Sequence, residues 1–354
     1  MVAPSVSSPP PAMPGDLQAA GLGIQQLQTW YDPTTGLWHT TGWWNAANSV
    51  TVLGVYSRLS GSSEYLPVIS NTFSRNESGG FLNQYYDDEG WWALAWIEAY
   101  DVTGQTSYLS MAEAIFSDMT TGWDGSTCNG GIWWNKTHTY KNAIANELFL
   151  DVAANLALRA SGSTTKTADL QWAEKEWQWF SQSGMINGQN LINDGLTISS
   201  SDPSSCQNNG QTAWTYNQGV ILGGLTALWQ LTQNSSLLGE AQTIAEAAIA
   251  ELTDSRGILH DACEPNHCGG DGVQFKGIFT RNLATLNAAQ PQPPYAAFLE
   301  TNAHSIWAND QGPNHQFGLV WSGPFSPLSV GAAAAQTSAV DCFLAADEAY
   351  SPGQ

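Results

Sequence analysis

Apolar residues recur along this chain at intervals of three and four positions, the spacing of helices that bury one face or their whole surface. Segments in which apolar and polar residues alternate, as in a half-buried strand, are almost absent. Clusters of Gly, Pro, Ser and Asn interrupt the helical pattern and favour turns. The pattern predicts an all-α protein with twelve helices, near residues 17–31, 43–60, 64–76, 88–101, 105–119, 140–160, 164–182, 213–233, 235–252, 273–288, 294–309 and 328–349.

The connections between these helices alternate in length. Short polar links follow the second, fourth, sixth and eighth helices, and a Pro-rich link follows the tenth. The other connections are long, near residues 32–42, 77–87, 120–139, 183–212, 253–272 and 310–327. Six antiparallel hairpins with their long loops at one end predict an (α/α)6 barrel, a six-hairpin toroid, in which those loops shape a cleft. We expect residues 16–350 to form one domain and residues 1–15, rich in Pro and Ser, to be a disordered N-terminal segment.

Composition and charge narrow the possible partners. The 354 residues are 42% hydrophobic, but 10 Lys and Arg face 31 Asp and Glu, and the net charge of −21 disfavours nucleic acid and anionic lipid surfaces. We expect no membrane span, and residues 1–15 lack the apolar core of a signal peptide. The uncharged polar surface is typical of secretion, and three glycosylation sequons are compatible with it, beginning at Asn76, Asn135 and Asn234. The 17 tryptophans favour carbohydrate, because the apolar faces of sugars stack on indole.

The five cysteines predict two disulfides and one free thiol. Cys263 and Cys268 are close enough in sequence to close a small loop. Cys128 and Cys206 both lie in long loops and could pair. Cys342 would then remain as a buried thiol in an Ala-rich helix.

A zinc site is the rival interpretation of the close cysteine pair. His260, Cys263, His267 and Cys268 are all residue types that bind zinc. Their spacing matches no standard zinc motif, however, so we expect no metal.

Two adjacent aspartates, Asp87 and Asp88, lie where the second long loop meets the fourth helix. Acidic residues at a helix start often cap free N–H groups, and this is the simplest interpretation of the pair. A glycosidase, however, needs two carboxyl groups beside one glycosidic bond, and adjacent residues favour the short separation of a retaining enzyme over the wider gap of an inverting one. Glu89 ranks third, as a capping or binding residue, and we expect Gly90 to let the substrate approach closely.

Aromatic and amide side chains recur at the same end of several predicted helices. Trp91 and Trp92 point to different faces of a helix, so at most one of them can stack on a sugar while the other belongs to the core. Amides and carboxylates recognise neighbouring hydroxyl groups, and an aromatic ring provides the floor of such a site. The predicted binding residues are Trp43, Trp44, Tyr86, Trp91, Trp134, Asn142, Asn146, Asp194, Tyr216, Asn217, Gln218, Phe275 and Lys276.

Four ordered motifs together resemble glycoside hydrolase family 76, the endo-α-1,6-mannanases and related fungal cell-wall transglycosidases. They span residues 85–92, 130–147, 216–219 and 275–279, and the resemblance extends over most of residues 16–350. It implies an (α/α)6 barrel, retention of anomeric configuration and cleavage of α-1,6-mannosidic linkages without a metal. It also implies that Asp87 is the nucleophile, that Asp88 is the acid/base and that Asp194 binds mannose hydroxyls.

The sequence therefore predicts a secreted, monomeric, endo-acting hydrolase of α-1,6-mannan that uses no cofactor. A transglycosidase on the same scaffold would pass the same covalent intermediate to a sugar hydroxyl. The chain carries no hydrophobic tail of the kind that signals a lipid anchor, and this favours hydrolysis. The same residues are also compatible with a carbohydrate-binding protein without catalytic activity and with an inverting enzyme.

Overall fold

The computed structural model describes residues 13–266 and 268–350 of the chain. Its twelve α-helices within this part are α1 Asp16–Gln28, α2 Trp43–Ser60, α3 Leu66–Asn76, α4 Tyr86–Thr103, α5 Thr106–Thr120, α6 Ala143–Arg159, α7 Ser163–Phe180, α8 Thr215–Thr232, α9 Ser235–Glu251, α10 Phe275–Ala289, α11 Pro293–Asn309 and α12 Ala332–Tyr350. They confirm the predicted helices to within a few residues. Most of the predicted N-terminal segment, residues 1–12, lies outside the described residues.

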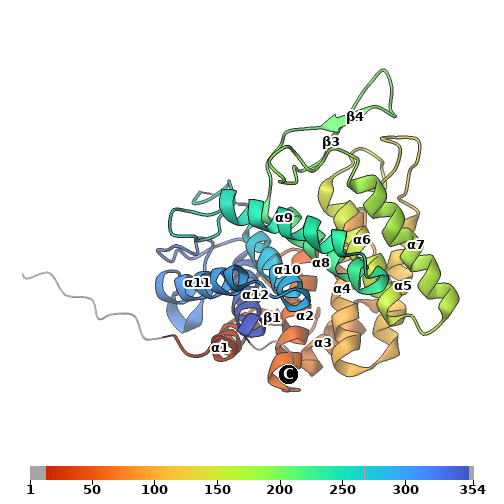
Figure 1. Ribbon diagram of the computed structural model, residues 1–354. Helices are drawn as coiled ribbons and strands as arrows, with labels where there is room; N and C mark the ends of the chain where they lie inside the picture. Colours follow the sequence, from red (N-terminus) through yellow and green to blue (C-terminus); the bar gives the residue numbers. More distant parts are fainter. Residues whose placement is uncertain (1–12, 267, 351–354) are drawn as a thin grey trace, which may run out of the picture.

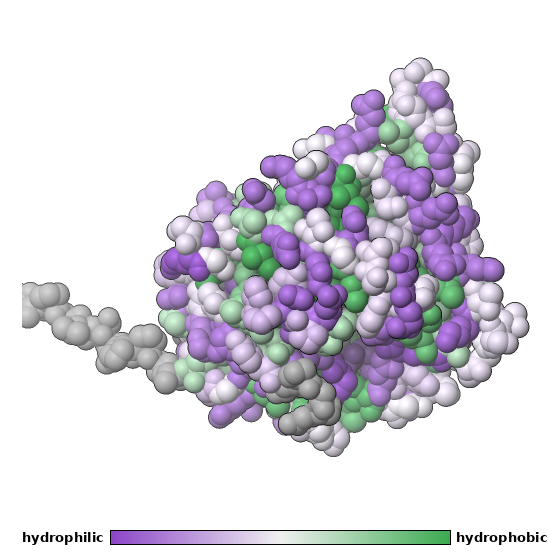
Figure 2. All heavy atoms as spheres, viewed as in Figure 1, coloured by the Kyte–Doolittle hydropathy of each residue, from purple (hydrophilic) through white to green (hydrophobic). Residues whose placement is uncertain are grey.

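Alternate helices form two concentric rings, and this confirms the (α/α)6 barrel (Figure 1). In the inner ring α2, α4, α6, α8, α10 and α12 each pack against the next, and α12 closes the ring against α2. The odd-numbered helices lie outside. Inner helices are buried over most of their surface, which explains why their apolar residues do not form a single stripe. In contrast, polar residues dominate the face of the molecule seen in Figure 2, with small apolar patches between them.

Glycines let the inner helices approach each other closely. A Cβ atom on Gly219 of α8 would lie 2.6 Å from the Cα atom of Phe279 in α10, and one on Gly277 would lie 2.5 Å from the carbonyl oxygen of Ser338 in α12. The same holds for Gly90, where a Cβ would lie 2.8 Å from the Cβ of Leu148. Gly90 therefore serves helix packing in α4, and the expectation that it admits substrate is wrong.

All six long connections precede inner helices, so the N-termini of these helices lie at the loop end of the barrel. The first connection carries the short pair β1 Tyr31–Asp32 and β2 Leu37–Trp38. The fourth carries β3 Leu196–Ile198 and β4 Cys206–Asn208, a hairpin that projects from the barrel (Figure 1). Short 3-10 helices lie in three of the connections, at Glu77–Gly79, Gly272–Gln274 and Pro313–His315.

Four of the long loops share one way of anchoring their backbone. Each contains an isolated antiparallel bridge, and one residue of that bridge donates its backbone N–H to an amide side chain of a helix. The amide nitrogen donates in return to a carbonyl of the same loop. The backbone N–H groups that donate to an amide oxygen are those of Ile132 to Asn146 (2.7 Å), Ile192 to Gln218 (2.8 Å), Leu259 to Asn302 (2.9 Å) and Phe317 to Gln336 (2.8 Å). In the same order, the amide nitrogens donate to the carbonyls of Ile132 (3.1 Å), Ile192 (2.9 Å), Gly257 (3.2 Å) and His315 (2.9 Å).

The cysteines form the predicted pairs. One disulfide joins Cys128 to Cys206 and ties the third long loop to β4, and the other joins Cys263 to Cys268. The second disulfide joins the two cysteines of the rival zinc site, so neither is a free thiol that could bind zinc. His267 of that site lies outside the described residues. Cys342 is a buried free thiol, as predicted. In the part of the chain that the structure describes, no helix is both long enough and apolar enough to cross a bilayer.

Candidate active site

A cleft of about 550 Å³ opens at the loop end of the barrel. Its lining comes from the long loops and from the first turns of inner helices: Gly42, Trp43, Trp44, Tyr85, Asp87, Asp88, Trp91, Trp134, Tyr140, Asn142, Asp194, Tyr216, Asp271 and Phe275. Both predicted catalytic aspartates and eight of the thirteen predicted binding residues belong to this set. The helix N-termini also direct their free N–H groups and positive dipole ends toward this end of the barrel.

Asp87 lies in the first turn of α4 and accepts two hydrogen bonds. The indole Nε1 of Trp134 donates to its Oδ2 at 2.9 Å, and the backbone N–H of Asp88 donates to its Oδ1 at 3.0 Å. Burial raises the pKa of Asp87 well above its ordinary value, the negative charge of Asp88 adds to this, and the two donors oppose it.

Asp88 has a different environment. Its Oδ2 accepts one hydrogen bond, from the side-chain amide of Asn83 at 2.5 Å. Burial raises the pKa of Asp88 to about 6, and the negative charge of Asp271 across the cleft contributes to the rise. A carboxyl group with this pKa holds its proton in mildly acidic solution, as a general acid must.

Glu89 does not line the cleft. Its Oε1 accepts the backbone N–H of Asn83 at 3.1 Å and forms an ion pair with Lys136 at 2.7 Å. Lys136 also pairs with Asp118 at 2.8 Å. Glu89 therefore anchors the loop that precedes α4 and makes no capping hydrogen bond at the described helix N-terminus.

Stacked aromatic rings form one wall of the cleft. Tyr216 and Phe275 lie face to face with ring centroids 3.8 Å apart, and Trp91 is stacked near Tyr216 at 6.5 Å. Trp44 continues the wall, with its ring centroid 5.4 Å from that of Trp91. Trp92, in contrast, is fully buried in the core. The expectation that one of the two adjacent tryptophans belongs to the core is confirmed for Trp92, and Trp91 is the one that lines the cleft.

Asp194 lies on the cleft surface within a small polar network. The hydroxyl of Tyr140 donates to its Oδ2 at 2.6 Å, and the side-chain amide of Asn209 donates to that hydroxyl at 2.7 Å. Burial raises the pKa of Asp194, and the bond from Tyr140 opposes this. Asn142 lies nearby as the N-cap of α6, and its backbone pairs with that of Gly195. The network positions a carboxylate in the same cleft as the aspartate pair.

Four lining residues were missed as binding candidates: Gly42, Tyr85, Tyr140 and Asp271. Asp271 is the fourth carboxylate of the cleft, and its Oδ1 accepts a hydrogen bond from Nε1 of Trp44 at 2.8 Å. The signal that could have identified it is its position, because Asp271, like Asp194, is an acidic residue of a long loop that precedes an inner helix.

Five predicted binding residues do not line the cleft. The side-chain amides of Asn146 and Gln218 hydrogen-bond to the loop backbone, as described above. Lys276 is buried and bonds to the carbonyl of Leu319 at 2.6 Å and to Glu264 at 2.7 Å.

Tyr86 and Asn217 are the other two. The ring of Tyr86 is buried beside Gly122, and its hydroxyl lies 3.2 Å from that of Thr121. The side chain of Asn217 is fully buried in α8. For these five residues the prediction of direct substrate contact is wrong in this structure.

The comparisons with known proteins agree with this geometry. The family model described as glycosyl hydrolase family 76 matches residues 19–351. The mannan endo-1,6-alpha-mannosidase DCW1 of Candida albicans is 28% identical over 309 residues, which cover 79% of this chain and 67% of that protein. DCW1 of Saccharomyces cerevisiae is also 28% identical, over 77% of this chain and 61% of its own length. The chain thus spans about half to two thirds of the curated relatives it matches.

Solved structures share the fold. The alpha-1,6-mannanase GH76A of Salegentibacter sp. HEL1_6, in complex with alpha-1,6-mannotriose, superposes with a TM-score of 0.83 at 23% identity over 94% of this chain and 99% of that one. Dfg5 from Chaetomium thermophilum, in complex with glucosamine, gives a TM-score of 0.80 at 20% identity over 95% and 90% of the two chains. With the family match along residues 19–351 and the barrel that carries the aspartate pair in its cleft, this chain belongs to glycosyl hydrolase family 76.

Proposed function

We propose that this protein is a secreted, retaining, endo-acting glycoside hydrolase that cleaves α-1,6-mannosidic linkages in mannan. The observation that carries the proposal is the pair Asp87 and Asp88, adjacent in the first turn of α4 and both facing one cleft with an aromatic wall. The names of the curated relatives support the linkage. The inactive forms of the bacterial mannanase carry substitutions at two consecutive aspartates, which supports the choice of residues. The two disulfides support secretion.

The proposed mechanism has two steps. In the first, a carboxylate oxygen of Asp87 attacks the anomeric carbon while Asp88 gives its proton to the departing glycosidic oxygen, so a covalent mannosyl ester forms and the C–O bond breaks. In the second, Asp88 takes a proton from water, the resulting hydroxide attacks the anomeric carbon, and the ester bond to Asp87 breaks. Two inversions give net retention. Both side chains end in their starting protonation states.

The remaining lining residues suit a sugar polymer. The wall that includes Trp91, Tyr216 and Phe275 offers apolar surface for the C–H faces of mannose rings. Asp194, held by Tyr140, offers a carboxylate to hydroxyl groups on the same sugar. Among the described residues, the side chains that line the cleft include three aspartates besides Asp87 and no Lys or Arg, which suits a neutral substrate better than an anionic one.

The test uses Asp87→Asn, Asp88→Asn and a control, Glu174→Gln, which makes the same charge change at an exposed position of α7. We expect each aspartate variant to lower kcat on α-1,6-mannooligosaccharides by about 10²–10⁴-fold or more, and the control to retain activity. If both aspartate variants cleave mannan at the rate of the parent, the catalytic assignment is wrong.

Stereochemistry and product length separate this function from its competitors. Proton NMR during the first turnovers should show the α-anomer of the new reducing end, and a 2-deoxy-2-fluoromannosyl label should be found on the peptide that contains Asp87. A β-anomer would indicate inversion. Products longer than the starting oligosaccharide would indicate transglycosylation, and binding without any product would indicate a carbohydrate-binding protein.

A further inference from the structure

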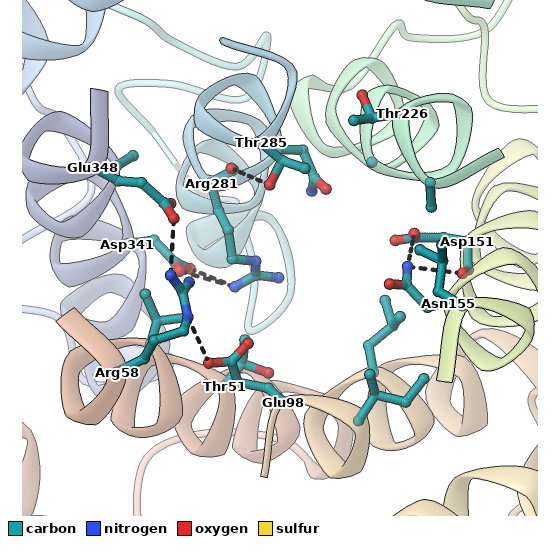
Figure 3. A pocket seen from close by; sticks show the side chains of 18 of the residues that line it. Thr51, Arg58, Glu98, Asp151, Asn155, Thr226, Arg281, Thr285, Asp341 and Glu348 are labelled. Atoms are coloured by element: carbon teal, nitrogen blue, oxygen red, sulfur yellow. Dashed lines mark hydrogen bonds and ion pairs between the residues drawn. The ribbon is translucent and has the colours of Figure 1, made fainter. Parts of the chain in front are cut away.

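A second cavity, of about 270 Å³, lies at the end of the barrel opposite the cleft. It is lined by the central and C-terminal parts of all six inner helices, with residues from α2, α4, α6, α8, α10 and α12 facing each other across the barrel axis (Figure 3). The two cavities share no lining residue. The proposed cleavage of mannan gives this cavity no role.

Charged groups are concentrated around this cavity. Three of the five arginines of the chain line it, Arg58, Arg159 and Arg281, in a protein with a net charge of −21. Each arginine already has a carboxylate partner. Arg281 contacts both oxygens of Asp341 at 2.9 and 3.0 Å, Arg58 contacts Glu348 at 2.9 Å and Glu98 at 3.4 Å, and Arg159 pairs with Asp101. The guanidinium charges are therefore compensated, and an anionic ligand would compete with these carboxylates.

Asp151 is the carboxylate of this cavity that has no cationic partner. It is 5% exposed, and none of the described lysines or arginines forms an ion pair with it. Its Oδ1 accepts a hydrogen bond from the side-chain amide of Asn155 at 2.7 Å, and its Oδ2 accepts none from any described residue. In Figure 3, Asp151 and Asn155 lie across open space from Arg58 and Arg281.

A second oxygen converges with Asp151. Asn282 is 8% exposed and donates its amide hydrogens to the carbonyl of Ile278, while its Oδ1 accepts no hydrogen bond from the described residues. A methyl group built on Gly223 would lie 2.3 Å from this Oδ1 and 3.2 Å from Oδ2 of Asp151, so both oxygens approach one point beside the glycine. Thr226, one turn further along α8, lines the same cavity, and its hydroxyl lacks a partner among the described residues.

We propose that this second cavity binds a small N–H-bearing cation, ammonium or a primary alkylammonium ion, between Asp151 and Asn282. Two convergent oxygens accept no hydrogen bond from the described residues, and one of them belongs to a carboxylate that forms no ion pair with these residues, so the point between them suits a ligand with both N–H donors and positive charge. An ammonium group supplies both. A metal ion fits less well, because no described group of three His, Cys, Asp or Glu side chains is arranged to hold one.

Binding should depend on pH, because the proposed site needs Asp151 in its charged form. Burial raises the pKa of Asp151 to about 7, and the charges of Arg281 and Arg159 and the bond from Asn155 oppose the rise. The cation should therefore bind more weakly as the pH falls below 7. The other charged groups that line the cavity are Arg58 of α2, Glu98 of α4, and Asp341 and Glu348 of α12.

The test measures the thermal unfolding temperature of the full chain at constant ionic strength. We expect methylammonium chloride to raise this temperature saturably at pH 8 and to raise it less at pH 6. Tetramethylammonium chloride, which has the same charge and no N–H donor, should have no such effect. An equal response to both salts, or no saturable response to methylammonium, would overturn the proposal.

Variants localise the response. Asp151→Asn keeps an acceptor for Asn155 but removes the charge, and Asn282→Leu removes the second acceptor while keeping the volume. Both should lose the response to methylammonium, while Glu174→Gln on the outer surface should keep it. Retention of the response in both cavity variants would place the cation elsewhere and refute the assignment. Because the readout is unfolding, the result is independent of any activity on mannan.

Discussion

The hydrogen bond from Trp134 to Asp87 gives the sharpest test of the proposed nucleophile. Replacing Trp134 by Phe removes the indole N–H, 2.9 Å from Oδ2 of Asp87, and keeps an aromatic ring next to Tyr85. A hydrogen bond to a charged group contributes about 1.5–3 kcal/mol. Because it stabilises the ionised carboxylate, its loss raises the pKa of Asp87. One pH unit corresponds to about 1.4 kcal/mol, so the acidic limb of the kcat/KM profile should move upward by about 1–2 pH units.

The assay is the pH dependence of kcat/KM on an α-1,6-mannooligosaccharide. Trp91→Phe is the matched control, since Trp91 lines the same cleft but its indole makes no hydrogen bond to Asp87 or Asp88. The control should change KM and leave the acidic limb in place. The reasoning fails if Trp134→Phe lowers the plateau without moving the limb, because Trp134 would then act only as a stacking surface.

Three further predictions follow from contacts around the site. Asp271→Asn removes a negative charge that raises the pKa of Asp88, so the basic limb of the profile, which requires protonated Asp88, should move to lower pH. Lys141→Met leaves four loop carbonyls without their shared ammonium donor, at 2.5 to 3.1 Å, and should lower the free energy of unfolding in urea by about 3 kcal/mol or more. In a glycosylating host, mass spectrometry should find a glycan at Asn234, which is exposed at the start of α9, and none at Asn135, which is buried.

The helices could be predicted from the sequence because local signals define them. The spacing of apolar residues and the turn residues between segments identified all twelve, and the alternation of loop lengths identified the barrel. The largest error at a boundary has a local cause. The last helix was expected from residue 328 and begins at Ala332. The preceding residue, Gly331, has a φ of 76°, which lies outside the helical range and keeps the helix from starting earlier.

The site could be predicted only in part, because amides have two uses at the loop end of the barrel. Asn146 and Gln218 have the chemistry of sugar-binding residues and lie at the predicted end of their helices. In the structure they hydrogen-bond the backbone of Ile132 and Ile192 instead. A long loop over a barrel carries many backbone groups that need partners, and an amide satisfies an N–H and a carbonyl together. The two uses look alike in sequence, since both place Asn or Gln in the first turns of inner helices.

The two adjacent aspartates at the start of α4 differ in the hydrogen bonds that they accept. Burial raises the pKa of both aspartates, and the charge of Asp88 is one cause of the rise at Asp87. That cause vanishes when Asp88 holds the proton, which leaves Asp87 with two donors, Trp134 and a backbone N–H, that favour its ionised form. Asp88 has one donor and faces the negative charge of Asp271, and these contacts favour the proton on Asp88, whereas the deeper burial of Asp87 opposes that placement. The two donors to Asp87 thus support its proposed role as the ionised nucleophile, with Asp88 as the proposed acid.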